Sequence, residues 1–142
     1  MTKKGNWQAL LHEFLLSHRF EPFEYGRWDC CLFVGGAVEV MTGVDPAAAL
    51  RGAYLTRAQA NRFMRTRGVR SVEAAVAAVA VEFGMVETDI PHAQRGDLAL
   101  VRNGRRDVSL GLVSLTGREV LLAAANGIWA GPLTLAVRAW HL

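Results

Sequence analysis

One segment organises this chain: Tyr25-Gly26-Arg27-Trp28-Asp29-Cys30-Cys31-Leu32-Phe33-Val34. A polar turn leads into Asp29, which is a good helix N-cap because its carboxylate can accept the free backbone N–H groups of the first helical turn. Cys30 then takes the first helical position, where the positive end of the helix dipole favours a thiolate. The residues that follow are apolar on nearly every side, so the pattern predicts a buried helix that ends near Thr42 and Gly43.

This arrangement has two interpretations. A cysteine at the head of a buried helix is how papain-like enzymes hold their nucleophile, which makes Cys30 a candidate catalytic residue. The structural alternative is that Cys30 and Cys31 are a small buried pair that packs a core, because free cysteine is among the most buried residue types. The residue types alone leave both interpretations open.

Length and composition indicate one globular domain over residues 1–142, with a core of its own. The chain is 51% hydrophobic and 20% charged, which is typical of a folded protein. Its 16 Lys and Arg exceed its 13 Asp and Glu only slightly. The arginines are scattered over residues 51–70 and 102–118, so we expect no nucleic-acid partner.

The chain has two cysteines, and they are adjacent. A disulfide between neighbours is strained, and no zinc-type spacing occurs, so we expect no disulfide, metal or cofactor. This usage suits a reducing compartment or a particle assembled in one. No secretory signal follows the charged N-terminus, and the apolar run over residues 74–81 is too short to span a bilayer.

The first half of the chain shows helical periodicity, and the second half shows strand patterns. Further helices are predicted from Asn6 to about His18, over 47–51, from the capping box Thr56–Gln59 to about Arg67, and from Ser71 to Phe83. Strands are predicted over 98–101, 108–113, 119–124, 128–129 and 133–140, with a hairpin turn at Asn103-Gly104. This order predicts an α+β fold in which the N-terminal helices pack on a C-terminal antiparallel β-meander.

Three segments in this order resemble the NlpC/P60 branch of the papain-like cysteine peptidases. They are Trp28-Asp29-Cys30-Cys31-Leu32-Phe33-Val34, Gly96-Asp97-Leu98-Ala99-Leu100-Val101 and Ser109-Leu110-Gly111-Leu112-Val113. The resemblance implies the NlpC/P60 fold and puts Cys30 at the nucleophile position. In that family a histidine, the general base, opens the third segment; here Ser109 stands in its place.

The chain also resembles the small NlpC/P60-related proteins encoded among the tail genes of siphophages and prophages. The shared segments are Trp-Asp-Cys-Cys, Thr42-Gly43-Val44-Asp45-Pro46, Arg51-Gly52-Ala53-Tyr54 and Arg138-Ala139-Trp140. This resemblance implies a virion protein of the tail tip or baseplate hub, assembled in the host cytoplasm. Its expected partners are other tail proteins.

The missing histidine decides between two functions. Positioned acid–base help contributes about 10²–10⁴-fold to a reaction, and a serine hydroxyl has no suitable pKa for it. The other histidines are His12, His18, His92 and His141, and none lies on the expected strand. The first hypothesis is therefore a pseudoenzyme, a structural tail protein on a cysteine-peptidase-like fold.

Four aromatic residues near element ends fit that hypothesis as interface anchors, although a core position is the alternative for each: Trp7, Tyr54, Trp129 and Trp140. The second hypothesis is an active cysteine peptidase or amidase that cleaves peptidoglycan peptides as the phage enters its host. Cys30 is then the nucleophile, and His92 or His141 an unconventional base.

Overall fold

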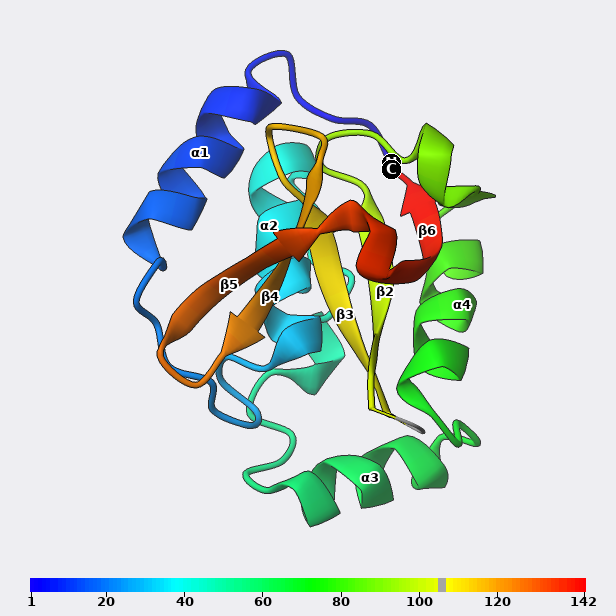
Figure 1. Ribbon diagram of the computed structural model, residues 1–142. Helices are drawn as coiled ribbons and strands as arrows, with labels where there is room; N and C mark the ends of the chain where they lie inside the picture. The colour runs from blue at the N-terminus through cyan, green and yellow to red at the C-terminus, as the bar shows by residue number, and fades with distance from the viewer. Residues whose placement is uncertain (105–106) are drawn as a thin grey trace.

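The computed structural model describes residues 1–104 and 107–142 and has an α+β fold, as predicted (Figure 1). Its α-helices are α1 (Trp7–Ser17), α2 (Cys30–Thr42), α3 (Arg57–Thr66) and α4 (Val72–Glu82). Its strands are β1 (Val86–Thr88), β2 (Leu98–Asn103), β3 (Asp107–Val113), β4 (Glu119–Ala124), β5 (Gly127–Pro132) and β6 (Ala136–His141). Short 3₁₀ turns are η1 (Ala48–Leu50), η2 (Ile90–His92) and η3 (Leu133–Leu135). Among the described residues, no helix has both the length and the apolar character that a bilayer crossing requires.

Helix α2 begins and ends where local chemistry predicts. The Asp29 side chain accepts a hydrogen bond of 3.0 Å from the Leu32 backbone N–H, and Gly43 closes the helix in the left-handed conformation (φ 87°). Seven consecutive residues, 32–38, are buried, so the helix runs through the interior as its all-round apolar sequence predicts.

The other helix starts follow the same rule with one exception. Thr56 Oγ1 accepts from the Gln59 N–H and Ser71 Oγ from the Ala74 N–H, each at 3.1 Å. Asn6 occupies the cap position of α1, but its side chain makes no cap hydrogen bond, so the prediction of Asn6 as a cap holds for position only. The predicted helical piece over 47–51 is a single 3₁₀ turn.

The sheet has the order β1-β6-β2-β3-β4-β5, and all its pairs are antiparallel. Strands β2 to β5 form the predicted meander, but the prediction is wrong for the last strand, because β6 returns to lie between β1 and β2. Residues 98–101 of β2 are buried, and an open edge there would leave backbone groups unpaired away from water. β6 supplies the partners, with Leu98 opposite Trp140.

The turn predicted at Asn103-Gly104 joins β2 to β3, whose pairing extends to Asn103 opposite Asp107. Arg105 and Arg106, which follow Gly104 in the sequence, lie outside the described residues. The pairing of β2 with β3 confirms the prediction of a hairpin between these strands.

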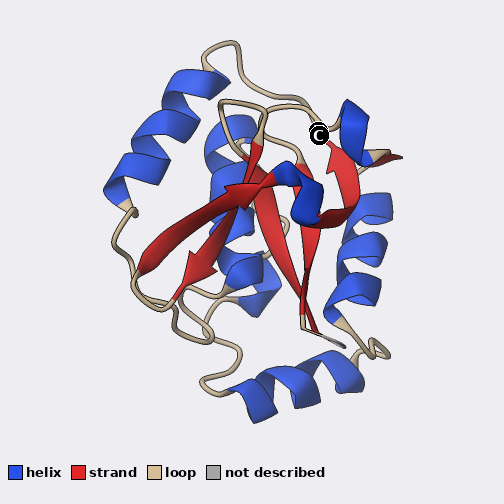
Figure 2. Cartoon of the chain, viewed as in Figure 1, coloured by secondary structure: helices blue, strands red, loops and turns tan. Residues whose placement is uncertain are grey.

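The sheet, red in Figure 2, has helices, drawn in blue, packed on one face. An apolar layer lies on each of its two faces. The larger core joins α1, α2 and α4 to one face of the sheet and includes Phe33, Leu100 and Leu112. A smaller cluster on the opposite face includes Val101 and Val120 and is covered by residues around η2 and η3. Side chains alternate across each strand, so β2 and β3 contribute to both layers. The sheet therefore holds the amino end of α2 against β3.

The turn before α2 depends on Gly26. Its φ is +80°, in the region that favours glycine, and a Cβ built on it would lie 1.8 Å from the Tyr54 carbonyl oxygen. The Gly26 carbonyl also accepts a 2.9 Å hydrogen bond from the Gly52 N–H. Gly52 has a similar φ of +69° but open space around its Cβ position. An alanine at Gly52 would therefore suffer backbone strain alone, whereas an alanine at Gly26 would suffer the same strain and a steric overlap as well.

We expect Gly52→Ala to lower the free energy of unfolding by about 1 kcal/mol, the cost of a left-handed alanine. Gly26→Ala should cost at least about 2 kcal/mol more, because the added methyl group overlaps a backbone oxygen. Urea denaturation of both variants measures the difference. Equal losses would contradict the close packing of Gly26 on Tyr54.

Candidate functional site

A buried carboxylate anchors the segment before Cys30. Asp29 is 3% exposed, and besides the Leu32 N–H it accepts the Gly26 N–H (3.1 Å) and the Tyr54 hydroxyl (2.6 Å). Burial and the bond to Asp29 raise the pKa of Tyr54, so its hydroxyl keeps its proton and stays a donor. Three donors thus satisfy one carboxylate and fix the position of the next residue, Cys30.

Cys30 opens α2 with its sulfur between a second thiol and strand β3. The two sulfur atoms of Cys30 and Cys31 lie 4.0 Å apart. The pKa of the Cys30 thiol is lowered, chiefly by the hydrogen bond with Cys31 and further by the Leu110 backbone N–H. Burial and the Asp29 carboxylate oppose this shift. The same hydrogen bond and burial raise the pKa of Cys31 well above its ordinary value, so Cys31 keeps its proton and serves as donor.

The lowered pKa of Cys30 has the direction predicted from its helix position. The neighbours responsible are different ones, however, because the adjacent thiol and the β3 backbone lower this pKa. The sequence contains one signal of this arrangement, the adjacency of the two cysteines, for which the catalytic and the packing interpretations were both open.

Ser109, at the position of the expected histidine, lies on β3 one residue before Leu110. Its hydroxyl accepts a hydrogen bond from the Asn103 side-chain amide on β2. Among the hydrogen bonds of the described residues, none joins Ser109 to Cys30. The structure brings the backbone of this part of β3 to the sulfur, while the Ser109 hydroxyl is engaged by Asn103.

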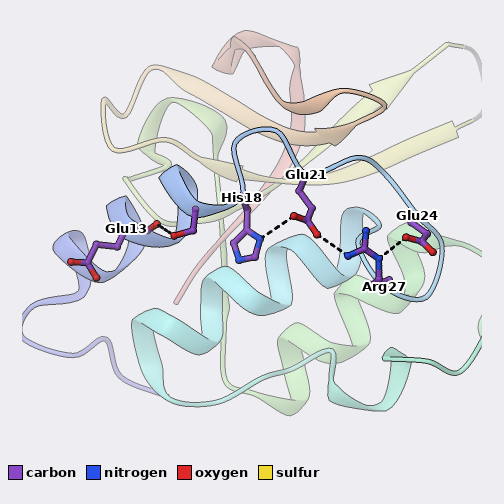
Figure 3. A network of polar contacts seen from close by, with 6 residues as sticks. Glu13, His18, Glu21, Glu24 and Arg27 are labelled. Carbon is purple, nitrogen blue, oxygen red and sulfur yellow. Dashed lines mark hydrogen bonds and ion pairs between the residues drawn. The ribbon is translucent and has the colours of Figure 1, made fainter.

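Two of the four histidines lie along α1 or just after it. His12 is exposed on α1. His18 follows α1, stacks on Trp28 with ring centroids 4.5 Å apart, and has its Nδ1 3.7 Å from a Glu21 carboxylate oxygen. Figure 3 shows His18 beside Glu21, which also pairs with Arg27 at 2.8 Å in the turn before α2. These contacts belong to the packing of α1 on that turn.

The other two histidines, His92 and His141, are the candidate bases. Among the hydrogen bonds of the described residues, none joins either of them to the Cys30 sulfur. His92 is exposed at the end of η2. His141 lies on β6, which β2 separates from β3, and its Nδ1 is 2.5 Å from the buried Asp97 carboxylate. Asp97 also accepts the Gln94 N–H at 2.7 Å and lies 3.7 Å from the Lys3 ammonium. The structure thus uses His141 to tie the C-terminal strand to the start of β2.

A cleft of about 610 Å³ opens beside the two thiols, between α3, the amino end of α2 and the β2–β3 hairpin. Its polar lining includes Tyr54, Asn103 and Ser109. No histidine is among the described residues that line it. The described residues also contain no group of three or more His, Cys, Asp or Glu side chains placed to hold a metal ion. The cleft therefore offers a thiol and hydrogen-bonding groups without an imidazole.

The other segments quoted for the resemblance to phage tail proteins lie in structural contacts. Asp45 accepts from the Ala47 N–H (2.9 Å) and from Arg51 (2.6 Å), which closes the turn after α2. On β6, Arg138 binds both carboxylate oxygens of Glu87 at 2.7 and 2.8 Å and reaches Glu73 on α4 at 3.1 Å. These residues join elements to one another, and of the quoted segments Arg51–Tyr54 alone reaches Asp29, through Tyr54.

Comparison with protein families gives one finding. A family model described as "Domain of unknown function (DUF6950)" matches residues 2–142, nearly the whole chain. A comparison with curated proteins gives no match.

We expect alkylating reagents to distinguish the two thiols. Iodoacetamide at neutral pH should modify Cys30 first, because the thiolate is the nucleophile and Cys31 holds its proton. The Cys30 rate should rise with pH and level off at a lower pH than for a free thiol. Cys31→Ala removes the donor and should shift that profile to higher pH, as mass spectrometry of the labelled chain over a pH series would show.

The control for this experiment is the chain unfolded in urea, in which both cysteines should react alike. In the folded original chain, label should appear on Cys30 before it appears on Cys31. Faster labelling of Cys31 than of Cys30 in the folded original chain would contradict the assignment.

Proposed function

The chain belongs to the DUF6950 family, and we propose that it is a non-catalytic structural protein of a phage or prophage tail tip or baseplate hub, on a cysteine-peptidase-like scaffold. One observation carries the non-catalytic part: among the described residues, the Cys30 sulfur has a thiol and a backbone N–H beside it, and no imidazole lines its cleft. Both neighbours donate hydrogen bonds to sulfur, and neither takes up a proton at neutral pH. Without a proton shuttle, the sulfur cannot pass a proton to a leaving group.

The tail location and the NlpC/P60 relationship are proposed from the resemblance of quoted segments. The structure adds that these segments are used in packing, as with Asp45 and Arg138, which is what a retained scaffold with altered chemistry requires. Of the four aromatic residues considered as interface anchors, Tyr54 and Trp140 are buried and Trp7 is half-buried against the core. Trp129 is 46% exposed on β5 and is the one that remains a candidate contact.

A competing function, an active peptidase or amidase acting on peptidoglycan, is favoured by one observation. Cys30 has a lowered pKa and lines an open cleft, as a nucleophile would. This candidate needs a histidine base, and no histidine is among the described residues that line the cleft. The two functions differ in one measurable respect, which is turnover that depends on Cys30.

Purified chain and its Cys30→Ala variant are incubated with peptidoglycan, and released peptides are measured by mass spectrometry. We expect both proteins to release the same trace amounts of peptide, because the loss of a positioned acid–base group lowers the rate of hydrolysis by about 10²–10⁴-fold. If the original chain releases peptides and Cys30→Ala does not, the competing function is established.

The location is tested on virions purified from the phage or induced prophage that encodes the chain. Mass spectrometry of separated tails should detect it at a fixed ratio to the other tail proteins. Virions that lack it would contradict the tail proposal, whatever the result with peptidoglycan.

A further inference from the structure

The net positive charge of this chain comes from one segment. Residues 57–70, which are α3 and the turn after it, contain five arginines and no acidic residue. This segment thus holds five of the 16 Lys and Arg of the chain. The remainder of the chain has 11 basic residues and all 13 acidic residues. Figure 1 shows α3 at the foot of the molecule, below the β2–β3 hairpin. The arginines that seemed scattered in the sequence thus give α3 a strongly positive surface on a chain whose remainder is slightly negative.

Three of these arginines, Arg57, Arg65 and Arg70, line the cleft beside Cys30. Arg57 is paired with Asp107 across the cleft at 3.3 Å. Arg65 and Arg70 make no ion pair within residues 1–104 and 107–142. Two guanidinium groups thus line the cleft without an acidic partner from the described chain.

The cleft walls between the arginines are mixed in character. Apolar side chains line it from α3, α4 and β3, and they include Met64, Val72 and Val108. Asn61 and Asn103 add amide groups that can bind a peptide backbone. Guanidinium groups bind carboxylates through two parallel hydrogen bonds, and apolar walls take up apolar side chains. These walls therefore match a peptide segment in which acidic and apolar residues are mixed.

A nucleic acid fits this surface less well. Proteins that bind single strands follow the phosphate backbone over about 4–16 nucleotides per module, along a continuous positive groove. Here the net positive charge comes from residues 57–70, and in the remainder of the chain 13 acidic residues exceed 11 basic ones. Asp107 also lies on the cleft wall. The shortness of the segment with net positive charge favours a short acidic peptide over a long polyanion.

We propose that the cleft beside Cys30 is a docking site for an acidic peptide segment of a partner protein, with Arg65 and Arg70 binding its carboxylates. The inference rests on the proposed function for the partner being another virion protein, and it adds the chemistry by which that partner is recognised. In this arrangement the cleft binds a protein segment without cutting it.

Selection of a random peptide library on the full chain tests the proposal and does not require the identity of the partner. At about 0.15 M salt, where charges more than about 8 Å apart are largely screened, the selected peptides should be enriched in Asp and Glu relative to the unselected library. The selection is repeated on Arg65→Gln/Arg70→Gln and on Arg62→Gln/Arg67→Gln. Both pairs remove two charges from the same segment, but Arg62 and Arg67 are not among the cleft-lining residues.

A fluorescein-labelled peptide from the selection then gives affinities by polarisation. Arg65→Gln/Arg70→Gln should weaken binding by about tenfold or more, because charge-assisted hydrogen bonds are lost, while Arg62→Gln/Arg67→Gln should change it by about twofold at most, since screened surface charges contribute little. Equal melting temperatures of the two variants guard against misfolding. No enrichment of acidic residues, or equal losses in both variants, would overturn the proposal.

Two further measurements complete the test. A single-stranded oligonucleotide of the same net charge as the peptide should bind more weakly; tighter binding would overturn the proposal in favour of a nucleic acid. Mass spectrometry of the peptide after incubation should show it intact. Cleavage with binding retained would contradict the proposed function alone, whereas an intact peptide whose binding does not depend on Arg65 and Arg70 would contradict only this inference.

Discussion

The hydrogen bonds to the Asp29 carboxylate are the constraint on which the rest of this structure depends. A buried carboxylate is costly unless its oxygens are satisfied, and here two backbone N–H groups and the Tyr54 hydroxyl satisfy them. The three donors come from the turn before α2, from the first turn of α2, and from the segment after η1. One carboxylate therefore joins three parts of the chain and sets the point at which α2 begins.

That starting point has a chemical consequence for the neighbouring residue. Cys30 is held where the Cys31 thiol and the Leu110 N–H both favour its thiolate, so the site keeps the acidity of a nucleophile. The second requirement of a cysteine hydrolase is a histidine that carries the proton, and no histidine is among the described residues that line the cleft. In the function that we propose, such a scaffold serves assembly with its thiol retained, because the proposed docking depends on the shape and charge of the cleft.

The parts of this architecture that could be predicted are those set by neighbours in sequence. The start and end of α2 follow from Asp29 and Gly43, and the caps at Thr56 and Ser71 follow from residues three positions apart. The position of β6 could not be predicted from its own sequence. It depends on β2, which lies about 40 residues earlier in the chain and needs a second partner strand. The sheet order is thus a tertiary property that strand patterns do not contain.

The candidate site divides in the same way. Cys30 could be identified from its place after a capping aspartate, whereas the Tyr54 hydroxyl is 25 residues away from Asp29 and carries no local signal of that contact. The arginines of residues 57–70 seemed scattered because none forms a run, and only the folding of α3 and its following turn brings three of them to one cleft. A search of the sequence for runs of charged residues does not find charges that only the tertiary structure brings together.

A double-mutant cycle on Asp29 and Tyr54 tests the central claim most directly. The free energy of unfolding is measured in urea for the original chain, Asp29→Ala, Tyr54→Phe and the double variant. The account predicts a coupling energy of about 1.5–3 kcal/mol, the range for a buried hydrogen bond to a charged group, so Tyr54→Phe should cost little once Asp29 is gone. Additive losses, with a coupling near zero, would contradict it.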